Sequence, residues 1–259
     1  MSAPVRVGIC GIAGRMGGEM VRAVSAASDL ALVAAIERAE HAWIGRAVEG
    51  VAVTSAIEVA ARECDVLVDF TAPAATARIA RAAAGGGAAL LCGATALGED
   101  DRAALAEASG RVAVLDGANF SLGVALLTRL VRAVARALPE ADVEIVEMHH
   151  RGKRDAPSGT ALHLARAIAA ALPAAGREAE HVERGARRGG AIGIHALRGG
   201  EVAGEHEVIF AGAGERIILT HRAESRAALA AGAIRAVRFL AGRAPGRYTI
   251  DDVLGGSGN

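Results

Sequence analysis

The feature that most constrains this chain is a glycine-rich turn between a short apolar segment and a helical one. Residues 5–10 (VRVGIC) form a short run that is apolar apart from Arg6, residues 11–17 read GIAGRMG, and residues 18–27 have a helical pattern. A second apolar run, 30–36, ends at Glu37 and Arg38. Strand, glycine turn, helix and strand with a terminal acid is the layout of a dinucleotide-binding βαβ unit. The sequence therefore predicts a pyrophosphate site at the start of the first helix, with a merely tight turn as the alternative.

The same alternation of strand and helix continues as far as residue 121. Strands are predicted at 66–70, 88–92 and 112–115, and helices at 74–84 and 100–109. Such alternation predicts a parallel sheet with helices on both faces. Because ligands bind these sheets beyond the carboxyl ends of the strands, we expect the segments that follow the strands to line the ligand site.

The pattern changes after residue 121, which predicts a second domain. A long amphipathic helix at 122–138 is followed by a strand at 143–147 and a helix at 160–172. Segments 191–198, 205–210 and 216–221 alternate like the strands of a mostly antiparallel sheet. An exposed loop is predicted at 184–190, a helix at 227–241, and residues 248–254 close the chain.

Charge and cysteine content exclude several classes of protein. The 259 residues include 29 basic and 29 acidic ones, and 52% are hydrophobic, which excludes intrinsic disorder and argues against nucleic-acid binding through bulk charge. The sequence has no sustained run of large apolar residues for a membrane span and no signal-peptide core. The 3 widely spaced cysteines suit a reducing compartment. We therefore expect a cytoplasmic protein with neither nucleic-acid nor membrane partners.

Lysine usage singles out one position. Of the 29 basic residues, Lys153 alone is a lysine. An ammonium group is compact and can lose its proton, whereas a guanidinium group stays charged. A lysine in so arginine-rich a chain indicates a place where a guanidinium cannot substitute; chance survival is the alternative.

The densest cluster of reactive groups is residues 147–160, EMHHRGKRDAPSGT. On a strand, His149 and His150 would point to opposite sides, so we expect them to have different roles. The PSGT run predicts a helix start whose N–H groups bind a carboxylate or phosphate, and Lys153 can neutralise that anion or donate a proton. The cluster predicts a site where an anionic small molecule is protonated. A metal site, ordinary strand histidines and a plain capping turn are the alternatives.

Seven motifs together resemble the dihydrodipicolinate reductase family of lysine biosynthesis, over essentially the whole chain. They are 11–17 (GIAGRMG), 69–71 (DFT), 119–121 (NFS), 147–160, 204–206 (GEH), 214–216 (GER) and 220–221 (TH). The resemblance implies reduction of 4-hydroxy-tetrahydrodipicolinate, a cyclic dicarboxylate, to tetrahydrodipicolinate in lysine and diaminopimelate biosynthesis, with NADH or NADPH as cofactor. It also implies a homotetramer joined through the sheets of the second domain.

The resemblance implies a role for each matching residue. His149 would be the proton donor or acceptor and Lys153 the second proton donor, with a water as the alternative to Lys153 and with no metal. The substrate would be held by His150, Gly159 and Thr160. The cofactor would be lined by Gly11, Ile12, Ala13, Gly14, Arg15, Met16, Glu37, Arg38, Gly93, Ala94, Thr95, Gly117, Ala118, Asn119 and Phe120.

The resemblance also implies the domain boundaries, because in this family the C-terminal helix returns to the first domain. Residues 1–121 and 230–259 would form a Rossmann-type dinucleotide-binding domain. Residues 122–229 would form an α+β domain for substrate binding and oligomerisation.

Two departures from the family pattern concern the cofactor. Ala96 ends the segment Gly-Ala-Thr-Ala where the family usually has Gly-Thr-Thr-Gly, so contacts near the nicotinamide ribose are expected to differ. Ala72 stands where some members carry an arginine, so we expect no strong preference for NADPH. Two other classes remain possible at this point: an NAD(P) enzyme acting on amino or imino acids, and a nucleotide sensor without catalysis.

Overall fold

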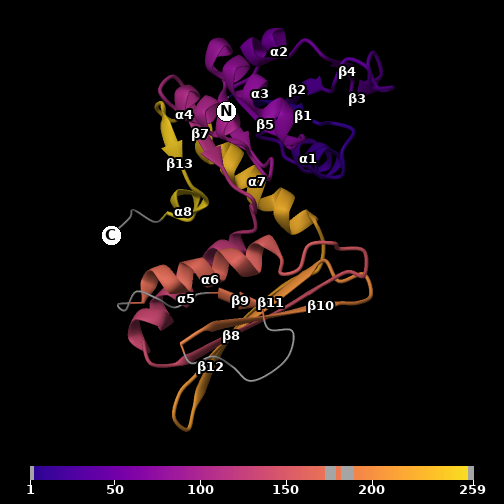
Figure 1. The fold of residues 1–259 in the computed structure, drawn as a ribbon. Helices are drawn as coiled ribbons and strands as arrows, with labels where there is room; N and C mark the ends of the chain where they lie inside the picture. Colours follow the sequence, from indigo (N-terminus) through magenta and orange to yellow (C-terminus); the bar gives the residue numbers. More distant parts are fainter. Residues whose placement is uncertain (1–2, 173–178, 182–189, 256–259) are drawn as a thin grey trace. The chain divides into compact units, whose positions relative to one another are not determined.

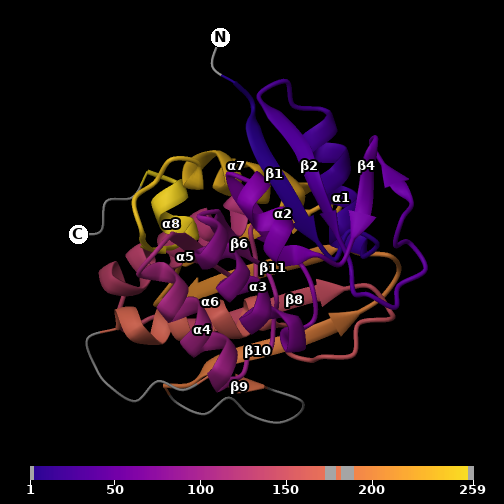
Figure 2. The same cartoon turned by 90° about the horizontal axis from the view of Figure 1, so that it is seen from above.

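The computed structural model describes residues 3–172, 179–181 and 190–255, and the chain divides into two compact units (Figures 1 and 2). Unit 1 comprises Met1–Ser121 and Leu229–Asn259, and unit 2 comprises Leu122–Ala228. Of the loop predicted at 184–190, only the exposed Gly190 falls within the described residues.

Unit 1 is built on an eight-stranded sheet in the order β13-β7-β6-β5-β1-β2-β4-β3. All neighbouring strands run parallel except β3 and β4. Its strands are β1 Val5–Cys10, β2 Leu30–Ile36, β3 Ala47–Val48, β4 Val51–Thr54, β5 Val66–Asp69, β6 Ala89–Cys92, β7 Ala113–Asp116 and β13 Gly246–Tyr248. Its helices are α1 Arg15–Ser25, α2 Ile57–Glu63, α3 Pro73–Gly86, α4 Glu99–Ser109, α7 Ala227–Leu240, which starts at the unit boundary, and α8 Ile250–Val253.

Helices cover both faces of this sheet. Figure 1 shows α2, α3 and α4 on one side and α1 and α7 on the other. Strands β5 and β6 are buried along their whole length, as expected when both faces are covered. On the side of α2–α4, Leu67, Leu90 and Val114 belong to one continuous apolar core. The strand order reverses at β1, so the glycine turn after β1 lies at the position where such sheets bind ligands.

Helix α2 and the hairpin of β3 and β4 were not predicted from the sequence. The two strands pair with each other over only two residues, too few for a visible alternation. The turn between them is Glu49-Gly50, with φ values of 48° and 80°. Two positive φ values are typical of a hairpin turn that favours Asn-Gly, so a glutamate at its first position hides the signal.

Unit 2 is a five-stranded sheet in the order β12-β11-β8-β10-β9, with two helices packed on one face (Figure 1). The strands are β8 Asp142–His149, β9 Ala179–His181, β10 Ile192–Arg198, β11 Gly204–Ala211 and β12 Arg216–Ala223, and the helices are α5 Leu122–Ala137 and α6 Gly159–Ala171. The core between them includes Val131, Ile145, Leu164, Ile194 and Phe210. Every second residue of β8 faces this core, which places Glu147 in it.

Pairing within the second sheet follows the connections. β11 runs antiparallel to both β8 and β12. β10 runs parallel to β8, and β9 runs parallel to β10. Since parallel neighbours need a crossover, α6 supplies the one between β8 and β10. The predicted fold class, a doubly wound parallel sheet plus an α+β domain with a mostly antiparallel sheet, is confirmed. In the described part of the second sheet two of the four pairings are antiparallel, and together these two extend over more residues than the two parallel ones.

Candidate functional site

The turn after β1 depends on its glycines. Gly11 has a φ of 76°, in the left-handed region that favours glycine, and its carbonyl accepts the N–H of Gly14 at 2.9 Å. A Cβ on Gly17 would overlap the carbonyl oxygens of Gly11 and Ile12. Helix α1 begins at Arg15, after Gly14, which has no side chain to cap it. The first N–H groups of α1 therefore suit an external anion such as a pyrophosphate.

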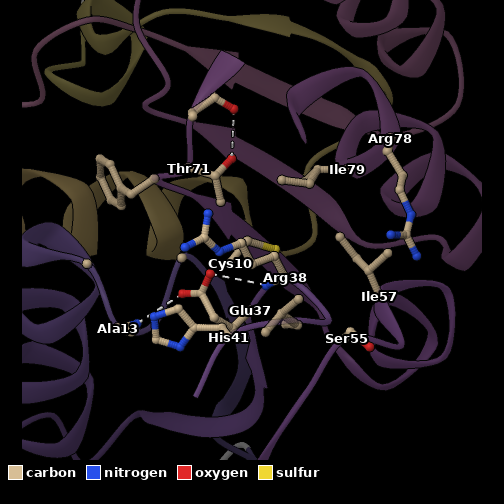
Figure 3. A pocket seen from close by; sticks show the side chains of 15 residues that line it. Cys10, Ala13, Glu37, Arg38, His41, Ser55, Ile57, Thr71, Arg78 and Ile79 are labelled. Atoms are coloured by element: carbon tan, nitrogen blue, oxygen red, sulfur yellow. Dashed lines mark hydrogen bonds between the residues drawn. The ribbon is translucent and has the colours of Figure 1, made fainter. Parts of the chain in front are cut away.

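A pocket of about 390 Å³ opens beside this turn (Figure 3). Glu37 and Arg38 lie together on one side of it, with Arg78 on the other. The Glu37 carboxylate accepts the N–H of Ala13 at 3.4 Å and that of Arg38 at 3.1 Å. The Arg78 guanidinium is paired with Glu58, at 2.9 and 3.0 Å. The pocket therefore combines one acid with two arginines.

The predicted cofactor residues divide into three groups. Gly11, Ala13, Gly14, Glu37 and Arg38 line the pocket. Ile12, Arg15 and Met16 do not line it: the first is buried and the other two begin α1. The remainder follow β6 and β7 at the carboxyl edge of the sheet: Gly93, Ala94, Thr95, Gly117, Ala118, Asn119 and Phe120. Because β1, β6 and β7 run parallel in one sheet, all three segments lie along the same edge.

Buried Asp69 organises the loop after β5. Its Oδ1 accepts the N–H of Thr71 at 2.8 Å and the hydroxyl of Thr71 at 2.6 Å, and its Oδ2 accepts a hydroxyl from α3 at 2.9 Å. Next to it, the rings of Phe70 and Phe120 meet edge to face with centroids 5.8 Å apart. A Cβ on Gly93 would overlap the Phe70 ring. The loops after β5, β6 and β7 thus form one packed rim.

Unit 2 carries a carboxylate in its core. Glu147 is 0% exposed, and four hydrogen bonds reach its two oxygens. The terminal nitrogens of Arg198 lie at 2.8 and 2.9 Å, the Ser158 N–H at 3.0 Å and Nδ1 of His149 at 2.6 Å. Burial alone would raise the pKa of this carboxyl group, but its imidazole, guanidinium and amide partners outweigh burial and lower the pKa to about 2. Glu147 is therefore ionised at neutral pH.

The imidazole of His149 lies in a narrow slot. The His206 ring meets it edge on, with centroids 5.2 Å apart. Next to it is Gly204, where a Cβ would lie 3.1 Å from Nε2 of His149. His206 is 3% exposed, and its Nε2 lies 3.1 Å from Oγ of Ser158. Burial, followed by the proximity of His149, lowers the pKa of His206 to about 4, so His206 is neutral at neutral pH.

Lys153 and His150 belong to the turn that follows β8. The Lys153 N–H donates to the carbonyl of His150 at 3.1 Å. Nζ of Lys153 lies 2.8 Å from Oδ2 of Asp155, and the lysine side chain is 21% exposed. The hydrogen bond from Lys153 lowers the pKa of Asp155. The backbone carbonyl of Asp155 also accepts a hydrogen bond from Arg198 at 2.6 Å, which ties this turn to the buried carboxylate.

The third part of the site is the start of α6. Ser158 caps this helix: its Oγ accepts the N–H of Ala161 at 3.2 Å. Gly159 and Thr160 follow the cap and lie in the first turn. The positive end of the helix dipole therefore lies next to the histidine and lysine, in the same unit, and favours an anionic ligand.

The side chains that surround His149 were not assigned roles from the sequence. Glu147 and Ser158 were part of the recognised motif but received no role. Arg198 lies 51 residues from Glu147 and reaches it because β10 pairs with β8. His206, on β11, is the cross-strand partner of Glu147. In the sequence, only the GEH motif at 204–206 pointed to it. Nothing in the sequence pointed to Arg78 in the unit 1 pocket.

In the part of the chain that the structure describes, no helix combines the length and apolar character needed to cross a membrane. Nor do three His, Cys, Asp or Glu side chains in those residues gather in a way that could hold a metal ion. His149 instead contacts Glu147, and His150 lies beyond the end of β8.

Family models match nearly the whole chain. The model described as dihydrodipicolinate reductase, N-terminus, matches residues 5–120, and the one described as dihydrodipicolinate reductase, C-terminus, matches residues 123–254. The 4-hydroxy-tetrahydrodipicolinate reductase of Alkalilimnicola ehrlichii is 45% identical over 268 residues, covering 96% of this chain and 98% of that protein. That of Thiobacillus denitrificans is 44% identical over 266 residues, covering 97% and 98%.

Solved structures agree with this match. A dipicolinate-bound dihydrodipicolinate reductase from Paenisporosarcina sp. TG-14 has a TM-score of 0.79 and 26% identity, covering 95% of this chain and 97% of that one. A DAP dehydrogenase from C. glutamicum, in complex with DAP, has a TM-score of 0.57 at 14% identity, covering 100% of this chain and 97% of that one. The second likeness concerns the fold alone.

Proposed function

Because the chain belongs to the dihydrodipicolinate reductase family, we propose that it reduces 4-hydroxy-tetrahydrodipicolinate to tetrahydrodipicolinate in lysine and diaminopimelate biosynthesis. The overall reaction takes one hydride and one proton and releases the 4-hydroxyl group as water. The observation that carries the proposal is the family match through both units, residues 5–120 and 123–254. Both the nucleotide-type turn and the histidine–lysine cluster lie within the matched residues.

In this proposal unit 1 binds NADH or NADPH. The turn after β1 fits a pyrophosphate, since a Cβ on Gly17 would overlap backbone oxygens and α1 starts without a side-chain cap. Glu37 and Arg38 would meet the adenosine ribose, and the segments after β6 and β7 would line the nicotinamide half. The bound nicotinamide supplies the hydride. Residues 1–121 and 230–259 would form this nucleotide-binding domain.

The histidine–lysine cluster would bind the substrate and supply protons. His149 would take up or donate a proton through Nε2, and Lys153 would donate a second one. The net uptake is one proton, because elimination of the 4-hydroxyl group as water also releases a proton from the ring. His150 and the start of α6, at Gly159 and Thr160, would hold the substrate carboxylates. The support is physical: the dicarboxylate matches the positive end of α6, and Lys153 can exchange its contact with Asp155 for a carboxylate of the substrate. Residues 122–229 would form this second domain.

The proposal includes a cytoplasmic homotetramer joined through the sheets of unit 2. Leu197 on β10 and Ile217 and Ile218 on β12 are 49%, 39% and 45% exposed, which supports association through these strands. Light scattering of the purified protein tests the assembly. A monomer at micromolar concentration would contradict it.

The function is tested by steady-state kinetics with each cofactor, combined with binding of 2,6-pyridinedicarboxylate to the protein loaded with NADH. We expect turnover of 4-hydroxy-tetrahydrodipicolinate and tight binding of the dicarboxylate. A nucleotide sensor would bind NADH and ignore the dicarboxylate. An amino-acid dehydrogenase would bind the dicarboxylate poorly and oxidise an amino acid instead. Either result would overturn the proposal.

A further inference from the structure

The carboxylate of Glu147 decides which nitrogen of His149 carries a proton. An ionised carboxylate only accepts hydrogen bonds, so Nδ1 of His149, at 2.6 Å, must be the donor. The hydrogen bond made by one ring nitrogen decides which of the two nitrogens carries the proton in the neutral ring. Nε2 is then the nitrogen that takes up or gives away a proton.

Arg198 keeps the proton on the imidazole. Its two terminal nitrogens contact the two oxygens of Glu147, and the Ser158 N–H reaches one of them as well. A buried carboxylate with one imidazole donor would be prone to take its proton. With the guanidinium and the amide in place, the carboxylate stays ionised whether His149 is charged or neutral.

The slot around the ring fixes its orientation. His206 packs edge on against His149 and, being neutral, adds no like charge. Gly204 has no Cβ, which leaves room for Nε2 where a methyl group would lie at 3.1 Å. Other charged and titratable groups near the slot are Glu147 on the same strand, Arg198 from β10, Lys153 from the turn and His221 from β12.

We propose that Glu147 is a positioning residue for proton transfer: clamped by Arg198 and the Ser158 N–H, it holds His149 as the Nδ1–H tautomer and directs Nε2 to the substrate. The proposal rests on the function proposed above. In the transfer the Nε2–H bond breaks, the proton moves to the substrate, and the electron pair stays on Nε2. Glu147 keeps its charge throughout. This arrangement uses the logic by which a buried aspartate orients a catalytic histidine in hydrolases.

The first test compares Glu147→Gln with Glu144→Gln. Glu144 provides a matched control because it makes a glutamate–histidine contact on the same strand, to His195 at 2.7 Å, on the opposite face of β8. We expect Glu147→Gln to lower kcat about 10²–10³-fold, with KM for the cofactor changed by less than about twofold. Glu144→Gln should keep kcat near wild type. Equal effects of the two variants would overturn the proposal.

The solvent isotope effect separates positioning from a structural role. Glu147→Gln should raise the solvent deuterium isotope effect on kcat, because a misplaced Nε2 slows proton transfer relative to the other steps. Gly204→Ala keeps every charge but crowds Nε2, so it should lower kcat and raise the isotope effect as well. An unchanged isotope effect in Glu147→Gln would contradict the proposal.

A spectroscopic test leaves Glu147 in place, so it stands even if Glu147→Gln fails to fold. Nitrogen-15 NMR of wild-type protein labelled at histidine reports each tautomer, and the His149→Gln spectrum assigns the signal. We expect the Nδ1–H form in neutral His149. Finding the Nε2–H form would overturn the proposal while wild-type turnover left the reductase function intact. Absence of wild-type turnover would instead contradict the function itself.

Discussion

The ammonium group of Lys153 lies 2.8 Å from the Asp155 carboxylate, beside the start of α6, and its side chain is only 21% exposed. We expect Lys153→Arg to lower kcat about 10²–10⁴-fold although the charge is kept, because a guanidinium does not release a proton at neutral pH. The reverse exchange at the exposed neighbour, Arg154→Lys, is the matched control and should leave kcat unchanged. Steady-state kinetics measure both. Near-normal turnover of Lys153→Arg would assign the second proton to water.

Glu37 and Arg38 act in opposite directions on cofactor choice. The Glu37 carboxylate favours a ribose diol and repels a 2′-phosphate, whereas Arg38 can pair with that phosphate. We expect wild-type kcat/KM values for NADH and NADPH within about tenfold, or in favour of NADH. Arg38→Ala should lower NADPH use about 10–100-fold more than NADH use, the value of one charge-assisted contact.

The second arginine of the pocket provides the control for this selectivity. Arg78 is already paired with Glu58, so Arg78→Ala should shift the NADPH/NADH ratio by less than Arg38→Ala does. Kinetics with both cofactors decide between them. A wild-type preference for NADPH above about a hundredfold, roughly 2.7 kcal/mol, that survives Arg38→Ala would assign phosphate recognition to Arg78.

At the scale of elements, the loop after β6 contains a non-glycine residue with a positive φ angle, a strain that glycine would relieve. Ala96 is exposed and has a φ of 59°, in the region that costs an L-residue about 1–2 kcal/mol. We expect Ala96→Gly to raise the free energy of unfolding by about 0.5–1 kcal/mol, after the larger backbone entropy of glycine is subtracted. Ala26→Gly, at an exposed position with a φ of −79°, should lower it by a similar amount. Urea unfolding measures the change in the free energy of unfolding for both variants. A lower value for Ala96→Gly than for the wild type would contradict the proposed strain at Ala96.

An element or site can be predicted from the sequence when the pattern that indicates it lies within a short stretch of the chain. Strands β1 and β2 have the predicted bounds, Val5–Cys10 and Leu30–Ile36, because each is a short run that is apolar apart from Arg6 and has a marked end, the glycine turn after β1 and Glu37 after β2. The cluster at 147–160 could also be predicted, because its reactive groups are close together in sequence. Arg198 was not visible, because its contact with Glu147 exists only after β10 pairs with β8.

At the scale of the whole molecule, the two units contain groups that respond to acid over different pH ranges. In unit 2, burial lowers the pKa values of His206, to about 4, and of His221. In unit 1, arginine partners lower the pKa values of the exposed Asp29 and Glu58 and of the half-buried Asp65. These carboxyl groups therefore change the stability of the fold only below about their ordinary pKa values of 3.8 and 4.5. Acid sensitivity above pH 4.5 is therefore expected from the buried His206 and the half-buried His221 of unit 2.

The free energy of unfolding depends on pH because the folded and unfolded chains bind different numbers of protons. Between pH 6.5 and 4, unfolded His206 binds a proton that folded His206 does not, so stability falls as pH falls. We expect the free energy of unfolding to drop by about 2 kcal/mol between pH 7 and 4.5 from His206 alone. Between the same two pH values, the free energy of unfolding of His206→Gln, measured with urea, should drop by about 2 kcal/mol less than that of the wild type. This difference is expected even if the variant is less stable at pH 7. Equal drops would place the acid sensitivity outside His206. Trp43, the single tryptophan, lies in unit 1, so its fluorescence gives a separate record of that unit during the titration.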